Sequence, residues 1–112
     1  MPGAHKQEPW NTPRAFKRFL LDIRLVIRGK ELLHGRTKDV GEGGLGAVIP
    51  GNIEIGEVVE LEIQLPHNNQ TLTFQAEVRY RQGFQYGFRF LRTTEEQREL
   101  IHRATRDLPA AP

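Results

Sequence analysis

The chain has 112 residues, with 16 Lys and Arg against 14 Asp and Glu, and no Cys. This length supports one domain and is too short for a Rossmann domain with a partner domain or for a barrel of eight βα units. The lack of Cys excludes a disulfide scaffold and a cysteine-ligated zinc site and favours a reducing, cytoplasmic setting, and no stretch approaches the roughly 20 apolar residues of a membrane span.

The net charge of +2 conceals an uneven distribution along the chain. Residues 1–40 carry nine basic and four acidic side chains, residues 41–77 carry six Glu and no Lys or Arg, and residues 78–112 carry seven Arg and four acidic side chains. Arg outnumbers Lys by 12 to 4, and the planar Arg guanidinium suits bidentate contact with phosphate or guanine. The charge pattern therefore indicates an anionic partner or, alternatively, an ordinary solvated surface.

The first half of the chain predicts an arm followed by strands. Residues 1–13 contain three Pro and no periodicity, which predicts a flexible arm ahead of a domain of residues 14–108. From residue 19 to residue 28 apolar and polar side chains alternate with the period of a half-buried strand. A weaker strand is expected over residues 32–38, followed by a glycine-rich stretch and a short apolar run at residues 47–49.

The second half predicts three longer strands and a helix. Strands are expected over residues 58–65, 72–80 and 84–90, with an inward face that includes Phe74, Tyr80, Phe84, Tyr86, Phe88 and Phe90. Thr94 with Gln97, or Thr93 with Glu96, fits a capping box that begins a helix, and Pro109 ends it. Six strands with short turns and one helix predict a mostly β protein, a small six-stranded antiparallel β-barrel with one C-terminal α-helix.

A glycine-rich segment between the second and third strands is the first candidate site. Gly41, Gly43 and Gly46 spell G-x-G-x-x-G, but no helix follows them, so a dinucleotide-binding Rossmann unit is excluded. Two interpretations remain: a turn in which Gly supplies positive φ, and a backbone left open for close approach of a ligand. Asp39, just before the glycines, is suited either to accept N–H donors from a base edge or to fix the turn.

The second candidate is a pair of arginines just before the first strand. Arg14 and Arg18 lie four residues apart, and an extended segment of that length spans up to about 14 Å. This separation suits two distinct anionic groups or guanine edges better than one phosphate. The alternative is an ordinary basic linker.

The two candidates together resemble the signature of PilZ domains, which are bacterial receptors for cyclic di-GMP. That signature is R-x-x-x-R in an arm that enters the first strand, followed about twenty residues later by D/N-x-S-x-x-G. Here Arg14 and Arg18 precede the run from Asp39 to Gly44, Gly46 adds a further glycine, and the resemblance covers residues 13–106. The resemblance implies a PilZ-like barrel.

The resemblance also implies roles for single residues. Arg14 and Arg18 would contact the guanine edges and phosphates, and Asp39 would accept hydrogen bonds from guanine N1–H and N2–H₂. Gly44 and Gly46 would keep that wall of the site low.

One position departs from the signature, because Gly41 stands where the family has Ser. A neutral hydrogen bond contributes about 1 kcal/mol, so weakened rather than abolished binding is expected.

The function implied by the resemblance is that of a stand-alone receptor or adaptor rather than an enzyme, with cyclic di-GMP as its ligand and no other cofactor. An arm of residues 1–18 is expected to be mobile until the ligand draws it onto the barrel, where a downstream protein in motility, exopolysaccharide synthesis or biofilm formation reads it. No membrane insertion and no metal site are expected, since the four His residues show no metal-ligand spacing. The alternatives are a degenerate PilZ module that binds only a protein and, less favoured, a small basic barrel that binds single-stranded nucleic acid.

Overall fold

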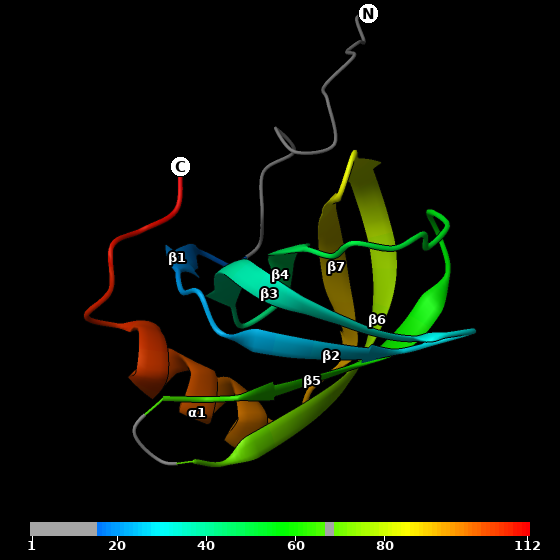
Figure 1. The fold of residues 1–112 in the computed structure, drawn as a ribbon. Helices are drawn as coiled ribbons and strands as arrows, with labels where there is room; N and C mark the ends of the chain where they lie inside the picture. The colour runs from blue at the N-terminus through cyan, green and yellow to red at the C-terminus, as the bar shows by residue number, and fades with distance from the viewer. Residues whose placement is uncertain (1–15, 67–68) are drawn as a thin grey trace, which may run out of the picture.

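The computed structural model describes residues 16–66 and 69–112, which form one antiparallel sheet and one helix (Figure 1). In these ranges the elements are β1 (Arg18–Leu20), β2 (Arg24–Arg28), β3 (Leu32–Gly41), β4 (Gly44–Val48), β5 (Val58–Gln64), β6 (Thr71–Gln82), β7 (Gln85–Arg92) and α1 (Glu95–Thr105). The sheet runs β3-β2-β5-β6-β7-β4 and closes through pairing of β3 with β4. The predicted six-stranded barrel with a C-terminal helix is confirmed, and β1 is a short addition that pairs with the end of β3.

The barrel interior is built as the alternation of apolar residues predicts. On β5, Val59, Leu61 and Ile63 are buried, while their neighbours along the strand face outward. The rings of Phe74 and Phe90 stack in the core with centroids 4.1 Å apart. Two aromatic side chains placed inward by the alternation lie elsewhere: Phe84 is 57% exposed in the turn between β6 and β7, and Tyr80 is only partly buried.

The helix begins where the sequence predicts and ends earlier. The Thr94 hydroxyl accepts from the Gln97 N–H at 3.0 Å, and the Gln97 side chain accepts from the Thr94 N–H at 3.1 Å, so this capping box is confirmed. The helix ends at Thr105, before the expected stop at Pro109. Buried Ile101 lies in the barrel core, so α1 packs across the end of the barrel at which β3 ends and β4 begins (Figure 1).

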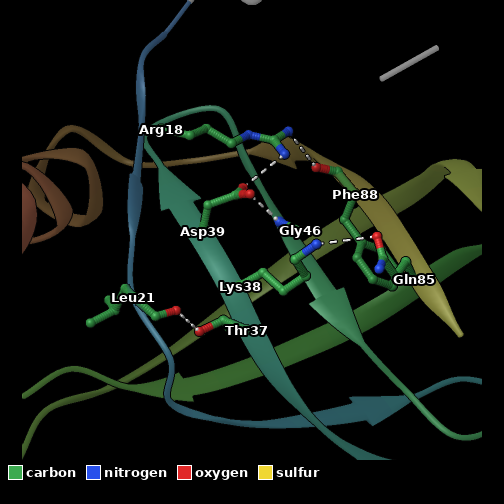
Figure 2. Close-up of polar contacts among 8 residues, drawn as sticks. All are labelled: Arg18, Leu21, Thr37, Lys38, Asp39, Gly46, Gln85 and Phe88. Carbon is green, nitrogen blue, oxygen red and sulfur yellow. Dashed lines mark hydrogen bonds and ion pairs between the residues drawn. The ribbon is translucent and has the colours of Figure 1, made fainter. Parts of the chain in front are cut away.

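The strand predicted from residue 19 to residue 28 is interrupted. β1 and β2 pair with the same edge of β3, and residues 21–23 between them belong to neither strand. Buried Thr37 bridges this break: its hydroxyl donates to the Leu21 carbonyl (Figure 2) and accepts from the Ile23 N–H at 3.0 Å. Because of this break, β1 pairs with the last residues of β3, and this pairing brings Arg18 next to the candidate site.

Candidate functional site

A β-bulge in β3 turns Asp39 to the outer surface of the barrel. In the pairing of β3 with β4, Thr37 lies opposite Ala47 and Asp39 lies opposite Gly46, which leaves Lys38 as an extra residue. An extra residue reverses the alternation of faces. Buried Thr37 and buried Val40 therefore point inward, while Lys38 and Asp39, adjacent in the sequence, both point outward.

The Asp39 carboxylate joins two parts of the site. One of its oxygens accepts from the backbone N–H of Gly46 at 3.1 Å and from Nη1 of Arg18 at 3.3 Å (Figure 2). The Arg18 and Asp39 side chains are only 13% and 16% exposed. This partial burial limits screening of the ion pair by solvent, so both charged groups are held in defined positions.

Backbone contacts on both sides of β1 position Arg18. On one side Arg18 pairs with Gly41 of β3; on the other its carbonyl accepts from the Ala111 N–H at 2.8 Å, and the Pro109 carbonyl accepts from the Leu20 N–H at 2.8 Å. The Arg18 guanidinium also donates to the Phe88 carbonyl of β7 at 3.4 Å. Arg18 was expected to belong to a mobile arm, but here it is part of β1 and is bonded to three other segments.

The glycines of the motif are explained by close approach and not by unusual φ. The expected tight connection between two strands is present, since β3 ends at Gly41 and β4 begins at Gly44, but among the described glycines only Gly56 and Gly83 have positive φ, so the expected positive φ of the motif glycines is wrong. A Cβ on Gly44 would lie 2.2 Å from the Phe88 carbonyl oxygen and 2.9 Å from Nη2 of Arg18. A Cβ on Gly46 would lie 3.2 Å from both carboxylate oxygens of Asp39. These two glycines make room for the Arg18 and Asp39 side chains above β4.

Gly41 has a different neighbour. A Cβ there would lie 2.4 Å from the Lys17 carbonyl oxygen and 3.1 Å from Cγ of Arg18. The chain that enters β1 therefore passes directly over Gly41. The glycine is required by this packing, which the sequence reading did not anticipate.

The family model of the PilZ domain matches residues 12–107. The chain belongs to the PilZ family. No curated protein matches it in a comparison of sequences.

Three solved structures show the same fold. The PilZ domain of CeSA from a cellulose-synthesizing bacterium is 16% identical with a TM-score of 0.63, and the match covers 79% of this chain and 93% of that one. The PilZ domain of YcgR from Escherichia coli, solved with c-di-GMP, is 16% identical with a TM-score of 0.71 and coverages of 87% and 92%. The inhibitor of motility MotI/DgrA from Bacillus subtilis is 17% identical with a TM-score of 0.68, covering 82% of this chain and 49% of that one.

In this PilZ domain the structure brings together Arg18, Asp39, Gly44 and Gly46, with Gly41 beneath β1. Arg14 lies outside the described residues. The sequence reading missed Lys38, whose ammonium donates to the Gln85 side chain of β7 at 3.1 Å across the outer face of β4 (Figure 2). Lys38 adds a second positive charge beside the ion pair.

Other predicted features lie away from this surface. Most Glu side chains of the acidic segment, residues 41–77, lie in ion pairs. Among them, Glu62 accepts from Arg28 at 2.5 Å, and its hydrogen bond and charge raise the pKa of that guanidinium. Within residues 16–66 and 69–112, no group of three or more His, Cys, Asp or Glu could hold a metal ion. In the same ranges, no helix has the length and apolar character needed to cross a membrane.

Proposed function

We propose that this PilZ domain binds cyclic di-GMP on the outer face of β3 and β4. The observation that carries the proposal is the placement of a guanidinium and a carboxylate, 3.3 Å apart, beside glycines that leave the β4 surface low. Guanine offers O6 and N7 as paired acceptors and has N–H donors on another edge, and a phosphate accepts the same Arg fork. One Arg and one Asp side by side match the mixed donors and acceptors of this ligand.

Each residue then has a role. Arg18 donates to a phosphate or to guanine O6 and N7, and Asp39 accepts from guanine N1–H and N2–H₂ while it keeps its bond to the Gly46 N–H. Lys38 adds positive charge for the phosphates. Arg14 is the second arginine of the motif, and we propose that it contacts the ligand from the side opposite to Arg18 and Asp39.

The signal would be relayed by the segment that precedes β1. Because β1 is already bonded to the barrel, we propose that the ordering step concerns residues N-terminal to Arg18. When Arg14 reaches the ligand, this segment is drawn against the outer face of β4, and a downstream protein reads the new surface. The protein is then a receptor or adaptor without chemistry of its own, with outputs such as motility or biofilm formation.

Calorimetric titration with cyclic di-GMP tests the proposal, with GTP as the ligand control. Arg18→Ala removes donors to charged groups, each worth about 1.5–3 kcal/mol, so we expect the dissociation constant to rise at least about tenfold. The matched control is Arg28→Ala, which also removes an ion-paired arginine but lies on β2 next to β5. Arg28→Ala should bind like the wild type.

Three other results would point elsewhere. Equal binding of GTP would mean a general anion surface. Binding of single-stranded nucleic acid that grows with strand length and falls steeply with salt would support the nucleic-acid alternative. Absence of any heat or melting shift with cyclic di-GMP would leave a degenerate domain that binds a protein partner.

A further inference from the structure

A second bulge, in β6, turns Tyr80 onto the same outer surface. In the pairing of β6 with β7, Val78 lies opposite Phe88 and Tyr80 lies opposite Gly87, which leaves Arg79 as the extra residue. Val78 is buried, and without the bulge Tyr80 would also point inward. The bulge reverses the alternation, so Tyr80 points outward and is partly exposed.

Tyr80 and Asp39 stand at the two ends of one row of residues. The strand registers place Asp39 opposite Gly46, Gly46 opposite Gly87, and Gly87 opposite Tyr80. Neighbouring strands are about 4.8 Å apart, so the row spans roughly 14 Å across β3, β4, β7 and β6. Its two middle positions have no side chain, and its ends are a carboxylate and an aromatic ring.

The Tyr80 ring leans over the row toward its centre. A Cβ on Gly87 would lie 2.3 Å from Cε1 and 2.4 Å from Cδ1 of Tyr80, so the ring occupies the space above that glycine. At Gly46 the three nearest atoms to such a Cβ all belong to the Asp39 carboxyl group. The surface over Gly46 therefore has a carboxylate on one side and an aromatic ring on the other.

We propose that Tyr80 is a base-stacking residue of this site and contributes to its affinity for a guanine ligand. This inference rests on the proposed function. A guanine whose N–H edge faces Asp39 lies over Gly46, and the next group along the row is the Tyr80 ring. Stacking of a base on an aromatic side chain contributes about 1–3 kcal/mol, and every base has a face that can stack. Asp39 then selects the edge of the base, and Tyr80 supplies the apolar contact.

A purely structural role predicts the same ring position. An aromatic side chain over a cross-strand glycine stabilises a sheet by covering the exposed backbone. That role requires only Tyr80 and Gly87, and it changes stability without changing affinity. The experiment must therefore measure binding and stability separately.

The first test compares substitutions of Tyr80. We expect Tyr80→Leu to raise the dissociation constant for cyclic di-GMP about tenfold and Tyr80→Phe, which keeps the ring, to stay within about threefold of the wild type. Phe84→Leu is the matched control, because Phe84 is 57% exposed in the turn between β6 and β7 and lies outside the row. Melting temperatures without ligand show how far each change affects folding alone.

The second test places a reporter in the ring position. Tyr80→Trp in a Trp10→Phe background leaves one indole in the chain, and a guanine stacked on it quenches its fluorescence. We expect saturable quenching by cyclic di-GMP, with a midpoint equal to the calorimetric one. Phe84→Trp in the same background should show no change.

The outcomes separate the two proposals. If the wild type binds cyclic di-GMP but Tyr80→Leu binds equally well and the Tyr80→Trp reporter is silent, the stacking role is wrong and the receptor function stands. If Tyr80→Phe binds as weakly as Tyr80→Leu, the hydroxyl acts and not the ring, which also overturns stacking. If the wild type itself does not bind, the receptor function fails and the stacking role fails with it.

Discussion

Restoring the family serine at Gly41 separates two explanations of this position. If Gly41 only lacks a hydroxyl that contacts the ligand, Gly41→Ser adds about 1 kcal/mol of hydrogen bonding and tightens binding about fivefold. The structure predicts the opposite effect, a weaker binding of the ligand by Gly41→Ser. A Cβ at Gly41 lies 2.4 Å from the Lys17 carbonyl oxygen, which is backbone and moves only if β1 moves.

The size of the effect follows from the contact. Forcing an extra carbon into a packed site costs typically about 1–3 kcal/mol. For a domain of this size, each 1 kcal/mol lowers the melting temperature by roughly 3–6 °C. A shift of β1 also moves Arg18, whose Cγ is 3.1 Å from the added carbon, away from Asp39. We therefore expect Gly41→Ser to melt several degrees lower and to bind cyclic di-GMP about tenfold more weakly.

Gly41→Ala is the matched variant, since it adds the carbon without the hydroxyl. The two variants should lose similar stability and similar affinity in differential scanning fluorimetry and calorimetry, because both losses come from the Cβ. Tighter binding by Gly41→Ser, with an unchanged melting temperature, would refute this reasoning. It would mean that β1 accommodates the added Cβ without loss of stability and that the serine hydroxyl contacts the ligand.

The polar contacts around β1 give further predictions. Thr37→Val removes the hydroxyl that bridges the break between β1 and β2, so the Leu21 carbonyl and the Ile23 N–H lose their hydrogen-bond partner. We expect urea denaturation to show that the free energy of unfolding falls by about 1–3 kcal/mol. Thr105→Val is equally buried but removes only a bond within the helix, so its loss should be clearly smaller. Ala111→Pro removes the N–H that donates to the Arg18 carbonyl; we expect severalfold weaker ligand binding by calorimetry, whereas Ala110→Pro, whose N–H is not part of that pairing, should bind nearly as the wild type does.

Much of the fold is predictable because burial has a simple period. The alternation that predicts β5 places Val59, Leu61 and Ile63 inside the barrel, as observed. The capping box of Thr94 and Gln97 fixes the start of α1 within a single turn of chain. In both cases the decisive contacts join residues that are close in sequence, or they follow a strict period.

The end of the helix and the break between β1 and β2 are not local in this way. The chain after Thr105 leaves the helix and its residues 109–111 pair with β1, which is about ninety residues earlier in the sequence. A helix pattern continued to Leu108 cannot reveal that competing pairing. Likewise, the break at residues 21–23 depends on the Thr37 side chain, which becomes a neighbour only after β3 has formed.

The candidate site depends mostly on such contacts between residues that are far apart in the sequence. The sequence motif names Asp39, Gly44 and Gly46, but strict alternation from Thr37 would place Asp39 on the inner face of the barrel. The change of frame becomes visible only in the structure: Thr37 and Val40 are three residues apart and both buried, a spacing that one regular strand does not allow.

The same reasoning applies to β6, where Val78 is buried and Arg81 lies opposite the buried Tyr86, with its guanidinium 5.2 Å from the centre of that ring. These inward positions are again three residues apart, so a bulge must lie between them and Tyr80 is turned outward. β3 and β6, the strands on either side of the β4–β7 pair, therefore each change frame beside Gly46 and Gly87. Deleting Arg79 should make β6 regular, and Tyr80, which then follows Val78 directly, should stay on the outer face opposite Gly87. The Asp39–Arg18 pair also remains in that protein, so we expect calorimetry to show cyclic di-GMP binding close to that of the wild type, and a large loss of affinity would contradict the stacking role of Tyr80.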